Sequence, residues 1–299
     1  MKKVLITGSN GLLGQALIRL FQKKFRILST GIEDTAELKT SENEYRVLDI
    51  TDIEKCKEVI NGFKPDVIVN AASFTNVDEC ENKKEICWQI NVKAVENLAN
   101  LARRHDIHLI HYSTDYVFNG KNGPYQETDR PQPLGYYGKS KLASENVLRQ
   151  IGCPSSIVRT CVLYGTGQAV KKNFFLWVLE NLQNKKTISV VTDQFNNPTL
   201  AEDLASGSLL MIEKAAVGLY HLAGEEYLNR FDFARLIAQI FGLPADRIKP
   251  IKTSQLKQSA VRPLLGGLKI DLAREKLGYH PRTVSESLQY LKQKIRKNE

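Results

Sequence analysis

Three glycines spaced three residues apart follow the first apolar run of the chain. The run reads KVLIT and the next segment reads GSNGLLG, which places Gly8, Gly11 and Gly14 between a predicted strand and a predicted helix. In such a strand–turn–helix, the free N–H groups and the dipole of the helix N-terminus favour a bound phosphate. Gly8 would permit the tight turn, Gly11 the close approach of a pyrophosphate, and Gly14 the packing of the helix on the sheet. The segment therefore predicts a dinucleotide-binding α/β fold.

The first half of the chain alternates short β-rich runs with amphipathic stretches. Strands are predicted over residues 3–8, 25–31, 44–50, 65–72, 107–114 and 155–164, and helices over 12–24, 52–63, 137–150 and a segment that ends near 106. Strands that alternate with helices at this spacing build βαβ units and a parallel sheet covered on both faces. We therefore predict a Rossmann-type fold with a doubly wound parallel sheet.

The alternation becomes less regular after Gly165. Helices are predicted over 173–184 and 231–243, and strands over 187–193 and 218–224. Such a change is expected where a smaller lobe follows the dinucleotide-binding part, and no flexible linker separates the two. We predict a Rossmann domain over residues 1–165, to which later segments return, and a C-terminal substrate-binding lobe over 166–299.

Charge and composition narrow the class of protein further. The chain of 299 residues has a net charge of +9, but its basic residues are spread out, apart from the tail LKQKIRKNE, and no nucleic-acid-binding motif occurs. A mildly basic enzyme that binds anionic nucleotides fits this charge. Because no apolar run reaches membrane-spanning length and Gly8 interrupts the N-terminal apolar stretch, we expect a cytoplasmic protein with no membrane and no nucleic acid as partners.

The cysteines, histidines and clustered acids predict neither a disulfide framework nor a metal site. The five cysteines form no CxxC pair and are odd in number, so we expect them to be reduced and without a chemical role. The histidines of HDIHLIHY are three residues apart, but a strand alternates its faces, so they cannot converge on one ion. Asp78, Glu79 and Glu81 are interpreted as an acidic turn at the start of a helix.

The ends of the predicted strands locate the rest of the cofactor site. No acidic residue stands at the end of the second strand, where it would bind the ribose 2′-hydroxyl of NADH, because Glu33 and Asp34 come slightly later. No arginine stands there for the 2′-phosphate of NADPH, so the choice stays open, with NADPH slightly favoured. Residues 49–50 close the third strand, a suitable border for adenine, and residues 71–72 close the fourth, where small side chains let the backbone pass near the cofactor.

A hydroxyl-rich stretch follows the strand predicted over 107–114 and carries the candidate catalytic groups. Tyr137 and Lys141 stand four residues apart, which places them on one face of a predicted helix. The pKa of a free tyrosine is about 10, and a lysine cation together with a charged nicotinamide lowers it toward neutral pH. Thr114 stands at a strand end, where it can hold a substrate oxygen beside Tyr137. A lone YxxxK pair is common on helix surfaces, but the glycine loop and Thr114 favour an acid–base catalyst.

Taken together, the motifs TGxxGxxG, NAA, STDYVF and YxxxK resemble those of the extended short-chain dehydrogenase/reductases. Within these, the chain resembles the dTDP-4-dehydrorhamnose reductases, the RmlD-like proteins. The segments that carry the resemblance extend from residue 5 to about residue 271, and TNVDECE, STDYVFNG and DQFNNPT are specific to the subfamily. The resemblance implies hydride transfer from NADPH or NADH to the C4 ketone of a nucleotide-linked 4-keto-6-deoxysugar, with Tyr137 as the proton donor.

The resemblance also assigns the site residue by residue. Thr114, Tyr137 and Lys141 match the catalytic threonine, tyrosine and lysine. The residues that match the cofactor site are Gly8, Asn10, Gly11, Leu12, Gly14, Asp49, Ile50, Ala71, Ala72 and Thr75, together with Tyr137 and Lys141. Those that match the substrate site are Val77, Thr114, Asp115 and Tyr116 and, less specifically, Asn173 and Arg262. Relatives further imply a homodimer, and a Mg²⁺ ion at subunit contacts whose ligands cannot be mapped onto this chain.

One departure from the family pattern leaves alternatives open. The strand after the catalytic helix reads RTCVLYG, with Val162 where the family has a tryptophan that packs on the substrate. A valine offers a sugar ring less surface, which would suit reduction or epimerisation of a different nucleotide sugar. The VLYG segment is also similar to the β subunits of methionine adenosyltransferase, homologous regulatory proteins without a catalytic role. The complete threonine–tyrosine–lysine set favours a reductase, most simply one that forms dTDP-L-rhamnose.

Overall fold

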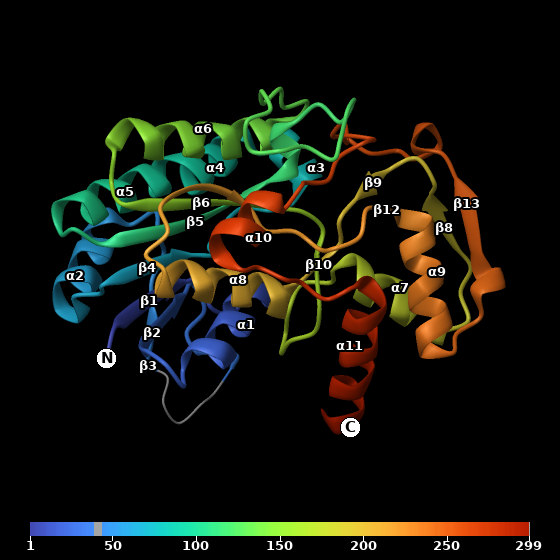
Figure 1. Ribbon diagram of the computed structural model, residues 1–299, viewed down its shortest axis with the longest axis horizontal. Coiled ribbons are helices and arrows are strands. Elements are labelled where there is room, and N and C mark those ends of the chain that lie inside the picture. Colours follow the sequence, from blue (N-terminus) through green and yellow to red (C-terminus); the bar gives the residue numbers. More distant parts are fainter. Residues whose placement is uncertain (39–43, 299) are drawn as a thin grey trace.

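A sheet of seven parallel strands forms the centre of the protein in the computed structural model, which describes residues 1–38 and 44–298 (Figure 1). The strand order is β11-β6-β5-β4-β1-β2-β3, so the direction of winding reverses between β1 and β4. The strands are β1 Lys3–Thr7, β2 Arg26–Gly31, β3 Glu44–Val47, β4 Val67–Asn70, β5 His108–Thr114, β6 Ser155–Thr160 and β11 Gly218–His221. This confirms the predicted doubly wound α/β fold.

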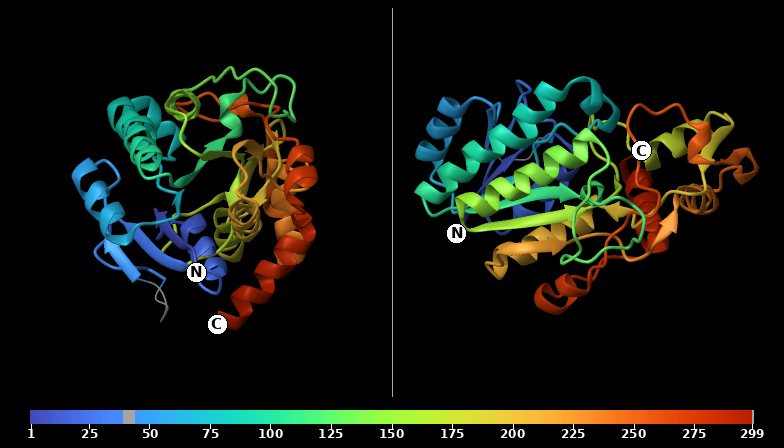
Figure 2. Two further views of the ribbon diagram at one scale, coloured as in Figure 1. Left: turned by 60° about the vertical axis from the view of Figure 1, so that its left-hand side comes forward. Right: turned by 90° about the horizontal axis from the view of Figure 1, so that it is seen from above.

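Helices cover both faces of the sheet because its central strands are apolar on both sides. In β1, Leu5 belongs to one core, whereas Val4 and Ile6 belong to the other, as the alternation of a strand requires. The first core lies under α2 Ile53–Phe63, α5 Ala94–Arg104 and α6 Tyr136–Ile151, and the second under α1 Leu12–Phe21 and α8 Ala201–Glu213 (Figures 1 and 2). The carboxyl ends of β1, β4 and β5 therefore lie between helices on both faces of the sheet.

The C-terminal part packs around a third core beside the sheet. In this part α7 Phe174–Gln183, α9 Arg230–Phe241 and α11 Val284–Asn298 pack with β8 Ile188–Val191 and β13 Ile248–Ile251, which pair with each other (Figure 1). The shorter elements are β7 Leu163–Tyr164, paired with β10 Thr199–Leu200, β9 Phe195–Asn196, paired with β12 Leu228–Asn229, and α10 Asp271–Leu277. Within residues 1–38 and 44–298, no helix is long and apolar enough to cross a membrane.

Three segments refine the sequence prediction. The strand predicted over 155–164 is interrupted between β6 and β7, because Val162 adopts a positive φ of 45°. The helix that ends near residue 106 is preceded by α3 Val77–Asn82, α4 Lys84–Trp88 and a π-helical turn at Gln89–Lys93. The strand β11, which comes after Gly165, pairs with β6 at the edge of the main sheet. The division of the chain at residue 165 stays a prediction.

A buried ion pair fixes α6 to the sheet. Glu145 is fully buried and accepts two hydrogen bonds from Arg159 of β6, from Nε at 2.9 Å and from Nη2 at 2.7 Å. Ser113 of β5 donates to the same carboxylate at 2.6 Å, and the half-exposed Arg149 donates to it at 3.0 Å. Burial alone would raise the pKa of Glu145, but the hydrogen bonds and charge of Arg159 outweigh this effect and hold its pKa below the usual value. Because Lys141 stands one turn before Glu145, the pair determines how α6 lies on β5 and β6.

The two arginines bound to Glu145 make a matched test of this attachment. We expect Arg159→Met to lower the free energy of unfolding by about 3 kcal/mol, because it leaves a buried carboxylate without its main partner. Arg149→Met should lower it by less than about 1 kcal/mol, because that guanidinium is exposed to solvent. Urea unfolding followed by circular dichroism measures both values. Equal losses in the two variants would contradict the assigned role of the buried pair.

Candidate active site

The glycine loop forms a cradle that excludes side chains at two positions. Gly8 has a φ of +65°, and a Cβ atom there would lie 2.7 Å from the backbone nitrogen of Ala72. A Cβ atom at Gly14 would lie 2.4 Å from the carbonyl oxygen of Gly8. Between them, the buried hydroxyl of Ser9 has no hydrogen-bond partner among the residues that the structure describes. Close backbone, the free N–H groups at the start of α1 and a spare hydroxyl together fit the phosphates of a dinucleotide.

Asn10 holds the segment after β2 against this cradle. Its Nδ2 donates to Oε2 of Glu33 at 2.9 Å and to the carbonyl oxygen of Thr35 at 3.1 Å, while its Oδ1 accepts from the backbone nitrogen of Glu37 at 2.9 Å. These contacts give Asn10 a role in shaping the loop. Direct contacts of Asn10 and of Leu12, the first residue of α1, with the cofactor stay predictions.

The other predicted cofactor residues follow the ends of β3 and β4. Asp49 is exposed at the turn into α2, whereas Ile50 is buried in the core beneath it. Ala71 and Ala72 leave β4 directly beside the glycine loop, and Thr75 is exposed three residues later. The carboxyl ends of parallel strands meet at one edge of a sheet, so these segments border the same crevice.

Thr114, Asp115 and Tyr116 lie together where β5 ends. The Oγ1 atom of Thr114 accepts from the backbone nitrogen of Tyr116 at 3.2 Å and lies 3.3 Å from Oδ1 of Asp115, to which it can donate. Asp115 is buried, accepts the N–H of Gly267 at 3.2 Å, and has its pKa raised to about 6 by that burial. The ring of Tyr116 meets that of Tyr137 edge to face, with centroids 5.9 Å apart. The end of β5 thus places a hydroxyl, a carboxyl and a phenol against the start of α6.

The first turns of α6 carry Tyr137, which is half-buried, and Lys141, which is buried. Burial raises the pKa of Tyr137 above its ordinary value, and the charge of Asp115 adds to this rise, while the hydroxyl of Thr114 opposes it. The phenol therefore keeps its proton and is suited to donate it. Lys141 is 2% exposed, and burial lowers its pKa to about 8. Its cation is thus available at neutral pH but not at strongly alkaline pH.

The ammonium group of Lys141 lies beside a buried histidine, His111. Its Nζ lies 3.3 Å from Nε2 of His111, and in the described part of the chain that ammonium has no other polar side-chain or backbone partner within hydrogen-bond distance. Burial, followed by the charge of Lys141, lowers the pKa of His111 well below its usual value, so His111 is neutral. Thr7 donates to Oδ1 of Asn70 at 2.6 Å, the Asn70 amide donates to Nδ1 of His111 at 3.2 Å, and the proton on Nε2 is donated to Ser144 at 2.9 Å. In this tautomer His111 offers Lys141 no acceptor, so the ammonium protons are free for the hydroxyls of a cofactor ribose.

Arg262 is held beside the predicted substrate residues by an acid that is distant in sequence. Its Nη1 and Nη2 donate to Oδ1 and Oδ2 of Asp78 at 2.6 Å each. Asp78 follows Val77 at the start of α3, and Arg262 also lies near the side chain of Tyr116. Asp78 does lie in the first turn of a helix, as interpreted from the sequence, but its pairing with Arg262 was not foreseen because 184 residues separate the two.

Two polar side chains of the site cap helices. Asn173 caps α7, since its Oδ1 accepts from the backbone nitrogen of Leu176 at 3.2 Å and its Nδ2 donates to the carbonyl oxygen of Gly165 at 3.0 Å. A contact between Asn173 and a nucleotide stays a prediction. Glu81 lies in the last turn of α3 rather than in its first, and its Oε1 accepts the N–H of Tyr136 at 2.6 Å. Glu81 therefore caps the start of α6 and helps to position Tyr137.

Val162 lies in strained backbone between β6 and β7. Its φ of 45° is in the left-handed region, where an L residue costs roughly 1–2 kcal/mol. The position is held because the carbonyl oxygen of Val162 accepts from the backbone nitrogen of Thr199 at 3.1 Å and the side chain packs against the core under α1 and α8. The backbone here is therefore set by its surroundings rather than by the preference of valine.

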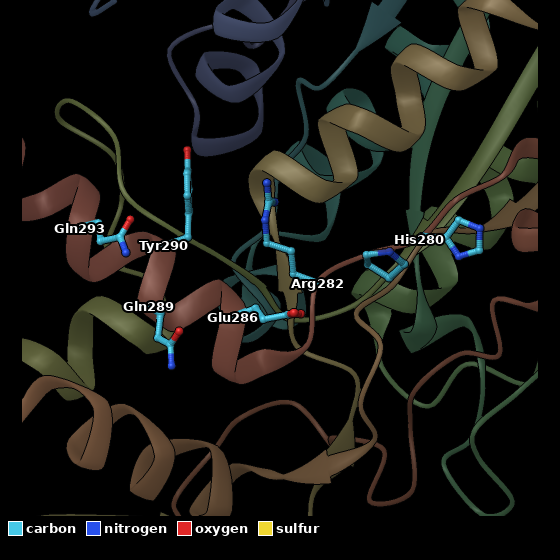
Figure 3. Close-up of a pocket in the computed structure, with 7 residues that line it drawn as sticks. His280, Arg282, Glu286, Gln289, Tyr290 and Gln293 are labelled. Carbon is cyan, nitrogen blue, oxygen red and sulfur yellow. The ribbon is translucent and has the colours of Figure 1, made fainter.

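A surface hollow of about 480 Å³ lies away from these groups, along α11 (Figure 3). Its lining includes Arg282 and Tyr290, with the Arg282 guanidinium 5.0 Å from the centre of the Tyr290 ring. Arg282 is also bound to Asp203 of α8. Arg282 is therefore already paired with Asp203, and none of the predicted site residues borders this hollow. We therefore take the region at the carboxyl ends of the strands as the candidate active site.

Comparisons with known proteins agree with this geometry. The chain matches the family described as RmlD substrate binding domain over residues 1–297. It is 34% identical over 293 residues to a dTDP-4-dehydrorhamnose reductase of Aggregatibacter actinomycetemcomitans, with 94% of this chain and 95% of that protein covered. It is also 31% identical over 290 residues to methionine adenosyltransferase 2 subunit beta of Bos taurus, with 94% and 84% covered.

Solved structures show the same similarity along nearly the whole chain. A dTDP-4-dehydrorhamnose reductase from Clostridium acetobutylicum has a TM-score of 0.89 at 30% identity, covering 98% of this chain and 99% of that one. A dTDP-4-dehydrorhamnose reductase from Bacillus anthracis, solved in complex with NADP, has a TM-score of 0.85 at 28% identity, covering 98% and 100%. With the Rossmann sheet, the glycine cradle and the Thr114–Tyr137–Lys141 arrangement, these matches show that the chain belongs to the RmlD family of extended short-chain dehydrogenase/reductases, a family of NAD(P)-dependent oxidoreductases.

Proposed function

We propose that this protein reduces the C4 ketone of a nucleotide-linked 4-keto-6-deoxysugar, and that its substrate is dTDP-4-dehydro-L-rhamnose and its product dTDP-L-rhamnose. The observation that carries the proposal is the meeting of Thr114 from β5 with Tyr137 and Lys141 from α6, next to the glycine cradle at the start of α1. A proton donor, a cation and a phosphate cradle at one crevice are what ketone reduction by a nicotinamide cofactor requires.

The chain's own residues perform the proton part of this reaction. The nicotinamide, when bound, supplies the hydride. Tyr137, neutral because burial raises its pKa, donates its proton to the C4 oxygen as negative charge develops there. Thr114 donates a hydrogen bond to the same oxygen and so stabilises that charge. Lys141 holds the ribose hydroxyls with its free ammonium protons, and its positive charge stabilises the phenolate that forms on Tyr137.

Arg262 and Asp115 complete the proposed substrate side. Arg262 presents a guanidinium at the start of α3, where it would bind a phosphate of the nucleotide diphosphate, and its pairing with Asp78 fixes its direction. Asp115, buried below Tyr116, would accept hydrogen bonds from sugar hydroxyls once ionised. Val77, which directly precedes Asp78 at the start of α3, would face the deoxysugar.

For the cofactor we propose NADPH in preference to NADH. The last residue of β2 is Gly31, so no carboxylate stands at the strand end to receive a ribose 2′-hydroxyl, and Glu33 beyond it is bound by Asn10 at 2.9 Å. The relative from Bacillus anthracis that was solved in complex with NADP supports the same choice. Titration of the protein with each cofactor, followed by nucleotide fluorescence, should give the lower Kd for NADPH.

A different nucleotide sugar is the second candidate substrate. The observation that favours it is Val162, whose side chain packs against the core and offers little surface to a sugar ring. Turnover with a panel of dTDP-, UDP- and GDP-linked ketosugars separates the two candidates, because the proposal requires the highest kcat/KM with dTDP-4-dehydro-L-rhamnose. The non-catalytic regulatory subunit is not favoured, since the full catalytic set is present and reductases are among the matched relatives.

A cytoplasmic location and a homodimer stay predictions. The same holds for Mg²⁺: no group of three or more His, Cys, Asp or Glu side chains suited to a metal ion occurs among residues 1–38 and 44–298.

Neighbouring tyrosines give a matched test of the proton donor. We expect Tyr137→Phe to lower kcat by about 10²–10⁴-fold, the usual contribution of a positioned general acid. Tyr136→Phe should leave kcat unchanged, because only the backbone nitrogen of Tyr136 is bound by Glu81. Oxidation of NADPH with dTDP-4-dehydro-L-rhamnose measures both. Full activity of Tyr137→Phe would remove this residue from the mechanism.

The pH dependence of turnover should report on Lys141. Its cation is present below a pKa of about 8 and is lost as the pH rises through that value, so kcat/KM should fall on the alkaline side near pH 8. Lys139→Met, on the same helix but exposed, should keep this profile, and Lys141→Met should lose activity at all pH values. A wild-type profile that stays flat up to pH 10 would show that the charge of Lys141 is not needed.

The glycine cradle is tested by adding a methyl group. Gly14→Ala would place a Cβ atom 2.4 Å from the Gly8 carbonyl oxygen, so we expect a loss of NADPH affinity and a lower melting temperature. Gly62→Ala is the control: it lies in α2, where an added Cβ atom would have its nearest contact at 3.8 Å, and alanine favours helix. Fluorescence titration and thermal denaturation measure both effects. Normal NADPH binding by Gly14→Ala would contradict the assigned phosphate site.

A further inference from the structure

Two cysteines lie in direct contact behind the catalytic helix. Cys80 of α3 and Cys87 of α4 are fully buried, and their Sγ atoms are 3.1 Å apart. A disulfide bond measures about 2.05 Å, so the two sulfurs need to approach by only about 1 Å to become bonded. Lys83, with φ of −114° and ψ of 53°, interrupts the helical backbone between them, which leaves a joint at which the two short helices can adjust.

The surroundings of this pair differ from those of the other three cysteines. Cys87 accepts a hydrogen bond from the amide nitrogen of Asn91 at 3.5 Å, and its sulfur lies 3.4 Å from the hydroxyl oxygen of Ser140 on α6. The contact with Cys80 lowers the pKa of Cys87 to about 7, against the effect of burial, and the neighbouring Ser140 and Asn91 and the charge of Lys141 add to the lowering. The same contact and burial raise the pKa of Cys80, so the shared proton stays there.

The remaining cysteines have no such activation. Cys56 and Cys161 lie near carbonyl oxygens, that of Ile50 at 3.6 Å and that of Asn197 at 3.0 Å, rather than near a second sulfur. Burial raises the pKa of Cys56 to about 12, and it raises that of Cys153 and that of Cys161 as well. All five cysteines are unbonded in the structure, but only Cys87 combines an activating environment with a partner thiol in reach.

We propose that Cys80 and Cys87 form a redox-active thiol pair that closes to a disulfide when a peroxide reaches it. The Cys87 thiolate attacks one peroxide oxygen, so an S–O bond forms, the O–O bond breaks, and the departing hydroxide takes the Cys80 proton to become water. The Cys80 thiolate then attacks the Cys87 sulfur, the S–S bond forms, the S–O bond breaks, and the second hydroxide leaves as water with a proton from solvent. Two thiols are oxidised and one hydrogen peroxide is reduced to two waters.

The burial of the pair explains the choice of a peroxide as oxidant. Five of the six residues that connect the two cysteines, Asn82 to Ile86, are exposed, so on this side the pair is covered only by the two short helices α3 and α4. A small, uncharged molecule such as hydrogen peroxide can enter through fluctuations of these helices. A disulfide of another protein could not oxidise the pair, because thiol–disulfide exchange requires direct access of one sulfur to the other, and here both sulfurs are buried.

The disulfide would act on the proposed reaction through α6. Reduced Cys87 carries negative charge that helps to keep the Lys141 ammonium protonated. Closure of the disulfide removes that charge and the Cys87 thiol that contacts Ser140. The hydroxyl of Ser140 in turn donates to the carbonyl oxygen of Tyr137 at 2.8 Å. Resting on the proposed function, we expect the alkaline fall of kcat/KM to move to lower pH in the oxidised protein and to return after reduction.

The bond itself is tested without any assay of activity. The folded wild-type chain is treated with hydrogen peroxide, its remaining thiols are blocked before denaturation, and it is digested with trypsin. Because trypsin cuts after Lys83 and after Lys84, a Cys80–Cys87 bond joins two separate peptides, which mass spectrometry detects as one species that dithiothreitol splits. We expect this linked species, and no linked peptides that contain Cys56, Cys153 or Cys161.

Single variants supply the controls. In Cys80→Ala the linked species should be absent and the sulfenic acid of Cys87 should be trapped by dimedone, whereas Cys87→Ala should give neither product. Circular dichroism establishes that both variants are folded, and the wild-type result stands even if one is not. The proposal is overturned if peroxide leaves both thiols of the wild type free, or takes Cys87 directly to sulfinic acid without the linked species. If the linked species forms but the pH profile of kcat/KM does not change, the redox-active thiol pair is established and its proposed effect on catalysis is refuted.

Discussion

The carboxylate of Glu145, buried against Arg159, is the contact on which the arrangement of the active site depends. An ionised carboxylate in the interior is costly unless its oxygens are bound, and here Arg159 and Ser113 bind it from two adjacent strands. The helix that carries Glu145 therefore has one position on the sheet. One turn before Glu145, the same helix carries Lys141. At the start of the helix, Glu81 caps the first turn, so the part of α6 that contains Tyr137 is fixed at its start by Glu81 and further along by Glu145.

Charge is distributed unevenly across the site, and this asymmetry suits proton transfer. Burial keeps Tyr137 neutral, and it lowers the pKa of Lys141, so that this ammonium loses its proton more readily than an exposed lysine does. The neighbouring His111 is neutral, and the proton on its Nε2 means that it offers Lys141 no acceptor. An ammonium buried without an acceptor is unfavourable in isolation. Ribose hydroxyls would relieve this cost, so cofactor binding and the ordering of the catalytic groups are expected to reinforce each other.

Local patterns in the sequence were sufficient for the fold and for placing Tyr137 and Lys141 on one helix, while their catalytic roles stay predictions. The glycine spacing and the alternation of strands and helices act over short distances, and Tyr137 and Lys141 share a helix face at a fixed spacing. Contacts between distant segments were not foreseen: Arg262 with Asp78, and Glu81 at the start of α6, join residues that only the folded chain brings together. The positive φ of Val162 was missed for a related reason, since β-branched residues favour strands and the surroundings override that preference here.

The same distinction applies to the thiol pair, Cys80 and Cys87. Their spacing matches no familiar cysteine motif, and the break between α3 and α4 is what turns the two sulfurs toward each other. A reductase that uses a nicotinamide cofactor would then have a second redox-sensitive group within contact of its catalytic helix, reached by an oxidant rather than by the substrate.

The most direct test of the account is the fate of the transferred hydride. The protein is incubated with NADPH deuterated at the reactive position of the nicotinamide and with dTDP-4-dehydro-L-rhamnose, and the isolated sugar is examined by NMR. The account predicts a single deuterium at C4 of the product, next to a newly formed hydroxyl. Recovery of unreacted ketone, or deuterium at any other carbon, would contradict the assignment of this crevice as the site of C4 reduction.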